Sequence, residues 1–284
     1  MTLQAATAAS MNCAFVRLAH EVGLPNVIAM AHRLGVSEYL PPYPSMVIGS
    51  IPVKPIEMAA AYATLADGGV YHKPSFINHI VDRTGTTIYT DNDPGQQVLP
   101  PDLVAEADAA FTAVVQYGTG TAAALYDRPV AGKTGTTSGN VDAWFNGFTP
   151  QLETTVWMGN PAAEISMSDV GGIAVYGGTY PAHTWHDFAV LALSDEPVMQ
   201  FPTLNYNTLP APVYVTSPSL VQDDLSDHNA APPPPSPVTT PGSTTTTVPG
   251  SGGSTSTTVP PTSTPTTRPG HGGGPPTTKG GPKN

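Results

Sequence analysis

Apolar residues recur at helical spacing in the first third of the chain. Phe15, Leu18 and Val22 lie three or four positions apart, which is the spacing of one helix face. Gly23 follows them, so we expect a helix at 14–21 that ends at this glycine. Similar spacings and end signals predict helices at 3–10, 14–21, 26–33, 55–69, 102–116 and 181–193, with an irregular segment at 36–53.

Alternating positions and short apolar runs predict β-strands in the remainder. Residues 74–89 alternate in polarity up to a turn at Thr84-Gly85, which predicts a hairpin. Two apolar runs at 144–148 and 154–159, joined through Thr149-Pro150, predict neighbouring antiparallel strands. Together these elements predict an α/β (α+β) fold class with an antiparallel sheet.

A further strand begins at Val130 and changes character along its length. Residues 130–139 read Val-Ala-Gly-Lys-Thr-Gly-Thr-Thr-Ser-Gly, an apolar start with a basic, hydroxyl-rich end. One fixed positive charge with several hydroxyl donors on a rigid edge suits a carboxylate ligand. The Lys-Thr-Gly tripeptide is also common in surface strands, where its lysine is solvated, so it needs a second motif to indicate a site.

Ser10-Met11-Asn12 is that second motif. It lies between two predicted helices, where a loop can direct two polar side chains into a cleft, although alone it is typical of a helix cap. With its flanking segments 3–6 and 14–19, the Lys-Thr-Gly box and the helix at 55–69, the chain resembles the transpeptidase domain of class A penicillin-binding proteins over about residues 2–195. The resemblance implies a β-lactamase/transpeptidase-like fold, with helices flanking the sheet, and no cofactor.

The resemblance also implies roles for individual residues. In such enzymes a serine attacks the penultimate D-Ala carbonyl of a peptidoglycan stem peptide, and an amine of a second stem peptide resolves the acyl-enzyme. Ser10 is expected to relay a proton, Asn12 to hold the substrate amide, and Lys133 to support the relay electrostatically.

The substrate-binding residues implied by the resemblance are Thr134, Gly135, Thr136, Thr137 and Ser138. The hydroxyls of Thr134 and Thr136 are expected to position the terminal carboxylate of the peptide, or the ring carboxylate of a β-lactam. The strand edge at 136–139 is expected to pair with the substrate backbone, and the Ser138 N–H to donate to the oxyanion.

One part of the family pattern is absent from this sequence. The nucleophile and its lysine come from a Ser-x-x-Lys motif well before the position of Ser10, and none of the five lysines here follows a serine by three positions. We therefore expect an N-terminally incomplete transpeptidase domain, inactive alone, whose Met1 is an internal start codon or the edge of a broken gene. Residues 1–9 have neither signal-peptide nor transmembrane character, so a membrane connection is expected only through a missing N-terminal anchor.

Charge and composition limit the kinds of molecule and ion that the chain is expected to bind. A net charge of −11 without a basic stripe argues against nucleic acid. The single cysteine, Cys13, excludes an internal disulfide, and we interpret it as a small buried packing group. His183 and His186 lack a third ligand, and residues 118–121 lack the lysine of a phosphate loop, so we predict neither a metal nor a nucleotide site.

The C-terminal part changes composition. From 217 onward Pro, Thr, Ser and Gly dominate the sequence. A segment of this composition cannot bury enough apolar surface to offset chain entropy, so we predict a disordered spacer. We divide the chain into the C-terminal part of a transpeptidase domain at 1–196, a transition segment at 197–216 and a disordered tail at 217–284. The full-length protein is expected outside the cytoplasm, at the cell wall.

Two other functions remain open at this level. A non-catalytic wall-associated module could hold stem peptides or a partner enzyme in the same cleft. A serine β-lactamase-like hydrolase carries the same motifs, although the long tail and the helix at 55–69 favour a transpeptidase.

Overall fold

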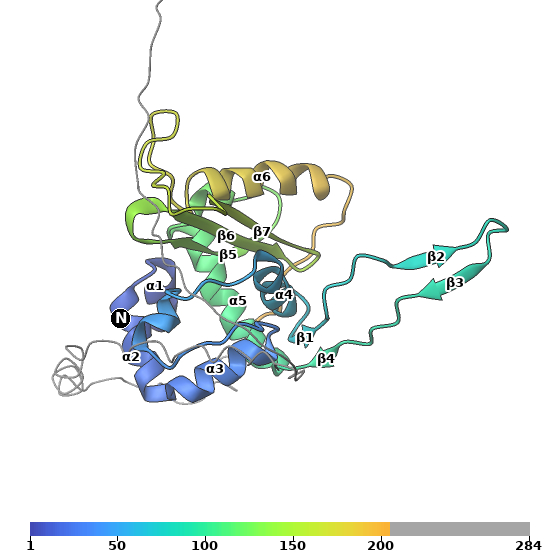
Figure 1. Ribbon diagram of the computed structural model, residues 1–284, viewed down its shortest axis with the longest axis horizontal. Coiled ribbons are helices and arrows are strands. Elements are labelled where there is room, and N and C mark those ends of the chain that lie inside the picture. The colour runs from blue at the N-terminus through green and yellow to red at the C-terminus, as the bar shows by residue number, and fades with distance from the viewer. Residues whose placement is uncertain (205–284) are drawn as a thin grey trace, which may run out of the picture. The chain divides into compact units, whose positions relative to one another are not determined.

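The computed structural model describes residues 1–204, and an antiparallel sheet forms its centre. The sheet has three strands in the order β5-β6-β7, namely β5 (Ala131–Thr136), β6 (Asp142–Thr149) and β7 (Leu152–Gly159). Helix α6 (Tyr180–Ala192) covers one face, which we call the outer face, and α4 (Pro55–Ala66) and α5 (Pro101–Gln116) pack on the other, the inner face (Figure 1). The predicted sheet with flanking helices is therefore confirmed.

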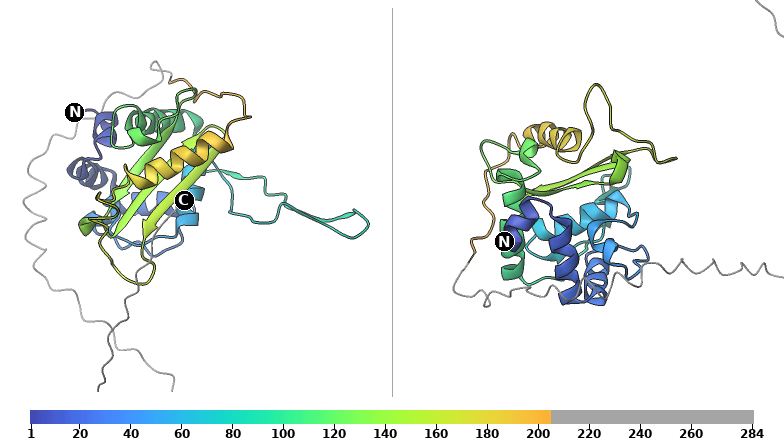
Figure 2. Two further views of the ribbon diagram at one scale, coloured as in Figure 1. Left: turned by 90° about the horizontal axis from the view of Figure 1, so that it is seen from above. Right: turned by 90° about the vertical axis from the view of Figure 1, so that its left-hand side faces the viewer.

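The remaining elements are short. The view of Figure 2 shows the first helices of the chain on the inner side of the sheet, opposite α6. They are α1 (Leu3–Ala8), α2 (Asn12–Val22) and α3 (Leu24–Arg33), and the single-turn 3-10 helices are η1 (Pro44–Ile48), η2 (Thr121–Ala123) and η3 (Ser138–Asn140). All six predicted helices exist, with ends that differ by a few residues. The predicted tail at 217–284 lies outside the described residues.

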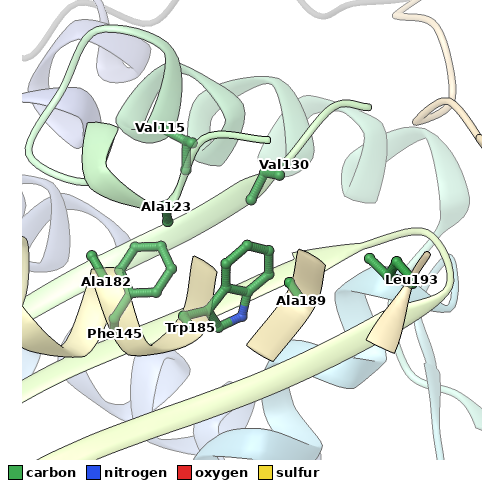
Figure 3. Close-up of a cluster of buried hydrophobic side chains, with 8 residues drawn as sticks. All are labelled: Val115, Ala123, Val130, Phe145, Ala182, Trp185, Ala189 and Leu193. Atoms are coloured by element: carbon green, nitrogen blue, oxygen red, sulfur yellow. The ribbon is translucent and has the colours of Figure 1, made fainter. Parts of the chain in front are cut away.

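The outer face holds the largest fully buried side chain, Trp185. Its ring meets Phe145 of β6 at a centroid distance of 5.8 Å, and its Nε1 donates to the backbone oxygen of Gly147 at 2.9 Å. Figure 3 shows both rings among the small apolar side chains that complete this cluster, Val115, Ala123, Val130, Ala182, Ala189 and Leu193. Helix α6 is thus fixed to the sheet by a buried aromatic pair and one directional hydrogen bond.

The inner face is packed by a second aromatic group. Tyr62 of α4 lies 5.7 Å from Phe111 of α5 and 6.2 Å from Phe148 of β6. The sequence pattern indicated that Met58, Tyr62 and Leu65 form the buried face of α4. These three side chains are half-buried, and Ala60, Ala61 and Thr64 are buried more fully, because small side chains let the helix approach its neighbours closely.

The chain beyond α6 returns to this inner face. Phe201, within the predicted transition segment, packs edge-to-face on Phe148 with ring centroids 5.6 Å apart. Gln151 Nε2 also donates to the backbone oxygen of Pro197. The boundary placed at 196–197 therefore remains a proposal, with packed residues on both sides of it.

The hairpin predicted at 74–89 forms, but its strands are shorter. They are β2 (His79–Val81) and β3 (Thr87–Thr90), with a register irregularity after Ile80, and every residue of both is exposed. No other strand of the described residues pairs with them, so the alternation has no core to face. At its base, β1 (Val70–Tyr71) pairs with β4 (Gln96–Gln97), a contact that the sequence did not indicate.

Cys13 is exposed, which corrects our interpretation of it as a buried packing group. It lies in the first turn of α2, and Ala19 is the one buried residue of that helix. Six residues correspond to about 240° around a helix, so Cys13 and Ala19 point in different directions.

Candidate active site

The structure brings Ser10 and Lys133 into direct contact. Lys133 Nζ donates to Ser10 Oγ at 2.7 Å and to the backbone oxygen of Thr134 at 2.8 Å. Ser10 lies in the turn between α1 and α2 with φ of 51°, in the left-handed region that non-glycine residues rarely adopt. The turn is closed by backbone hydrogen bonds from Ser10 to Thr7 and from Met11 to Ala6. A strained backbone thus presents the serine to the lysine.

Helix α1 is positioned by the segment after α5. The N–H of Thr119 donates to the backbone oxygen of Ala8 at 3.1 Å. A Cβ on Gly118 would lie 2.4 Å from that same oxygen, so only glycine permits this approach. Gln4 Nε2 also donates to the Ala109 oxygen on α5. The glycine-rich segment, for which we predicted no nucleotide site, therefore holds the serine turn against the sheet.

Lys133 sits in a protected environment. Burial lowers the pKa of its amine from 10.5 to about 8. None of the ion pairs among residues 1–204 includes Lys133. With this pKa about a tenth of the amine is neutral at neutral pH, and neutral amine is the form that can accept a proton.

Asn12 is not joined to this pair. It is the first residue of α2 and is exposed, and no side-chain hydrogen bond connects it with another residue in the described part of the chain. Its predicted role in holding the substrate amide stays a prediction.

The Lys-Thr-Gly box lies on β5, where successive side chains point to opposite faces. The Thr134 hydroxyl lies 2.6 Å from Thr119 Oγ1, and Thr134 is buried. Thr136 is exposed, and its hydroxyl accepts the N–H of Gly177 at 3.0 Å. Binding of a carboxylate by these hydroxyls remains a prediction for both residues, and Thr134 can donate to a carboxylate while it accepts from Thr119.

The strand ends earlier than the sequence indicated. We expected 136–139 to continue as a strand edge, but β5 ends at Thr136. Thr137 is tied to Asp142 by backbone and side-chain hydrogen bonds, and Ser138 begins the η3 turn. Gly139 and Asn140, both with positive φ, reverse the chain there. The exposed Ser138 therefore lies on a turn, and its role as an oxyanion donor stays a prediction.

One edge of β5 is unpaired within residues 1–204. Because the N–H of Thr137 donates to the Asp142 oxygen on the β6 side, alternation points the backbone groups of Thr136 to the opposite side. No strand of the described residues pairs there, since β5 has β6 as its sole neighbour. An extended peptide could add to this edge beside the Lys133–Ser10 contact.

Sequence reasoning missed Gly177, which determines how the loop before α6 covers β5. A Cβ there would lie 2.2 Å from the Trp144 oxygen and 2.8 Å from the Gly135 nitrogen, both backbone atoms. The Gly177-Gly178 pair was a usable signal of close backbone approach. Gly135 lies beneath this loop with its neighbours in register on β6.

The described residues offer neither a metal-binding cluster nor a helix suited to cross a membrane. Residues 1–204 contain no group of three or more His, Cys, Asp or Glu arranged to bind a metal ion. No helix there combines the length and the apolar character needed to cross a bilayer.

Comparison with known proteins gives one consistent family. Residues 1–164 match the penicillin binding protein transpeptidase domain. Penicillin-binding protein 1A of Aquifex aeolicus is 41% identical over 160 residues, which are 56% of this chain and 22% of that protein. Penicillin-binding protein 1A of Mycobacterium tuberculosis is 32% identical over 200 residues, 62% of this chain and 24% of that protein. The chain thus spans about a quarter or less of these curated relatives.

Solved structures agree with this match. PonA1 of M. tuberculosis superposes with a TM-score of 0.66 at 28% identity, covering 75% of this chain and 64% of that one. The same protein in complex with penicillin V gives a TM-score of 0.66 at 29% identity, covering 75% and 62%.

Proposed function

We propose, because the chain belongs to the family of penicillin-binding protein transpeptidase domains, that it forms the lysine and substrate-edge part of a D,D-transpeptidase site. In the whole protein this site cross-links peptidoglycan stem peptides through an acyl-enzyme. The single observation that carries the proposal is the 2.7 Å contact between Lys133 Nζ and Ser10 Oγ beside the unpaired edge of β5.

The Lys133–Ser10 contact supports proton transfer. A lysine whose pKa is lowered to about 8 can exchange a proton near neutral pH, and the Ser10 hydroxyl can both accept and donate one. The two groups can therefore pass a proton between an attacking hydroxyl, supplied by a Ser-x-x-Lys serine elsewhere in the whole protein, and the leaving amine. Neither group needs to be the nucleophile itself.

The free edge of β5 supports substrate binding. Thr136 is the last strand residue, and its backbone groups point away from β6. We therefore assign an oxyanion-donor role to the Thr136 N–H, in preference to the Ser138 N–H on the turn that follows. The exposed Thr136 hydroxyl, at the end of the strand that carries Lys133, can receive the carboxylate of a stem peptide or of a β-lactam.

The same reasoning covers partners and location. Stem peptides are the proposed substrates and β-lactams the proposed inhibitors, as penicillin V is bound in one of the similar structures. The whole protein is proposed to work in the cell envelope, where its substrate lies.

Covalent labelling with a fluorescent penicillin tests this function. The purified 284-residue chain and a form extended by the upstream in-frame residues of its gene are each incubated with the probe and analysed by gel and intact mass. We expect labelling of the extended form alone, at a serine of a Ser-x-x-Lys motif.

Other outcomes contradict the proposal in defined ways. Labelling of the 284-residue chain itself contradicts the absence of a nucleophile, and Ser10 is then the first residue to mutate. Absence of labelling in both forms favours the non-catalytic binding module. Rapid turnover of the probe in place of a stable adduct favours the β-lactamase-like hydrolase.

A further inference from the structure

A row of polar side chains crosses the inner face of the sheet and begins at Lys133. Lys133 of β5 is directly opposite Asn146 of β6, and Asn146 is directly opposite Thr155 of β7. Glu153 lies two positions from Thr155 on the same strand and so on the same face. Opposite residues on one face of antiparallel strands have Cβ atoms about 5 Å apart, so each side chain in the row can influence the next.

Hydrogen bonds connect the far end of this row. Thr155 Oγ1 lies 2.8 Å from Asn146 Oδ1 and 2.9 Å from Glu153 Oε1. One hydroxyl has one hydrogen, while an amide oxygen and an ionised carboxylate have none. With the Asn146 amide oxygen on this side, both contacts are hydrogen bonds together when Glu153 is protonated and donates to Thr155, whose own hydrogen then reaches Asn146. The network therefore has a direction, from β7 toward β5.

The surroundings of Glu153 favour its protonated form. Burial is the largest influence on this carboxyl and raises its pKa from 4.5 to about 8. The neighbouring phenol of Tyr62 on α4 also has a raised pKa, through burial and the proximity of Glu153. The other titratable side chains on this face or on the helices packed against it are Asp142 of β6, Glu57 of α4, and Asp102, Glu106 and Asp108 of α5.

The direction of the network determines which end of the Asn146 amide is turned to the lysine. Asn146 is buried, and its Oδ1 is engaged by Thr155 on the β7 side. The amide nitrogen makes no hydrogen bond in the described structure, and Lys133 stands directly opposite Asn146 on β5. An N–H group turned to a lysine amine favours its neutral form, whereas an amide oxygen there favours the ammonium.

We propose that Asn146, held by Thr155 and a protonated Glu153, is a positioning residue that turns its amide nitrogen toward Lys133 and keeps this lysine able to accept a proton. The inference rests on the proposed function for its meaning in catalysis. The pH at which the Lys133 amine titrates can be measured without any catalysis.

The test measures the titration of the Lys133 amine in the 284-residue chain. The folded protein is labelled with trace acetic anhydride across pH 6 to 11, and acetylation of each lysine is measured by mass spectrometry of peptides. The exposed Lys54 and Lys73 serve as internal references. Circular dichroism confirms that each variant is folded.

Thr155→Val is the central variant, and Thr154→Val is its matched control. Thr154 is the adjacent threonine on the same strand, points to the outer face, and has no side-chain hydrogen bond in the described structure. Without the Thr155 hydroxyl the Asn146 amide is free to turn its oxygen to Lys133. We expect Thr155→Val to raise the Lys133 inflection by roughly half to one pH unit, and Thr154→Val to leave it unchanged.

Two conservative variants separate the network from other effects. Thr155→Ser retains the hydroxyl, and Glu153→Gln retains a donor to Thr155 while removing the carboxyl, so both are expected to titrate like the wild type. Thr155→Ala removes the same hydroxyl with less volume and replaces Thr155→Val if that variant does not fold.

Three results overturn the inference. These are a lower or unchanged Lys133 inflection in Thr155→Val, an equal shift in Thr154→Val, and a shift in Glu153→Gln as large as in Thr155→Val. The last result assigns the effect to the charge of Glu153 in place of the orientation of Asn146. Because the readout is the amine and not penicillin, failure of the proposed function leaves this result interpretable.

Discussion

Lys133 Nζ and Ser10 Oγ lie 2.7 Å apart although the two residues are 123 positions apart in the chain. The contact depends on two independent placements, a strand edge for the lysine and a left-handed turn for the serine. The docking of α1 against Gly118 and Thr119 brings these two parts together.

The left-handed conformation of Ser10 predicts an unusual order of variant stabilities. Ser10→Gly removes the hydroxyl but relieves the backbone, whereas Ser10→Ala removes the hydroxyl and keeps the strain. We expect Ser10→Gly to have a free energy of unfolding about 1 kcal/mol higher than Ser10→Ala, measured by denaturant unfolding. An alanine variant more stable than the glycine variant contradicts the left-handed turn.

The burial of Asp108 is expected to make the stability of the fold depend on pH. Asp108 is 2% exposed, its Oδ1 has no hydrogen-bond partner among residues 1–204, and burial raises its pKa from 3.8 to about 7. The folded state therefore binds this proton more tightly than the unfolded state, so the stabilisation is complete below about pH 4 and is lost as pH rises to about 7.

Replacing Asp108 by asparagine removes that loss. The free energy of unfolding of Asp108→Asn relative to wild type is expected to increase by roughly 3 to 4 kcal/mol between pH 4 and pH 8. Asp127→Asn is the control, because Asp127 is exposed and its pKa is lowered by the hydrogen bond from Arg128. A pH-independent difference for Asp108→Asn contradicts a buried, protonated carboxyl.

A side chain at position 177 is expected to clash with the backbone of β5 and β6. In Gly177→Ala the new Cβ lies 2.2 Å from the backbone oxygen of Trp144, which cannot move without distorting β6. We expect a loss of roughly 2 kcal/mol or more in the free energy of unfolding. Gly172→Ala in the same loop meets open space and is expected to cost about 1 kcal/mol through its positive φ alone. Equal effects of the two variants contradict close packing of the loop on β5 and β6.

Trp185 predicts a measurable contribution of one buried hydrogen bond. Trp185→Phe leaves the Gly147 oxygen without its indole donor and leaves space beside Phe145. A loss of about 2 to 3 kcal/mol is expected in thermal or denaturant unfolding. Phe188→Leu on the same helix is a suitable control, since Phe188 is 47% exposed and should change stability by less than about 0.5 kcal/mol. Comparable losses in both variants contradict the packing of α6.

Some of this arrangement could be predicted from the sequence. The family resemblance predicts that the Lys-Thr-Gly box and Ser10 belong to one site. The spacing of apolar residues predicts the helices and strands around them. The direction of individual side chains could not be predicted in the same way. Thr134 follows Lys133 directly and so faces away from it, toward Thr119, a partner that no local pattern identifies.

Other features depend on contacts between distant segments. Cys13 is exposed because its face of α2 has no neighbour in the described structure, whereas its residue type suggested burial. The early end of β5 results from a turn at Gly139 and Asn140, and the glycine was the visible signal. Asn146 was a polar residue within an otherwise apolar run, and only the register across three strands relates it to Lys133.

The most direct test of the account is the rate of penicillin acylation in the upstream-extended protein with Ser10 or Lys133 altered. The central claim is that this pair transfers the proton for a nucleophile supplied elsewhere in the protein. We predict that Ser10→Ala and Lys133→Met each slow acylation by roughly 10² or more, while Thr154→Val retains the wild-type rate. Acylation of Ser10→Ala or Lys133→Met at the wild-type rate would contradict the claim.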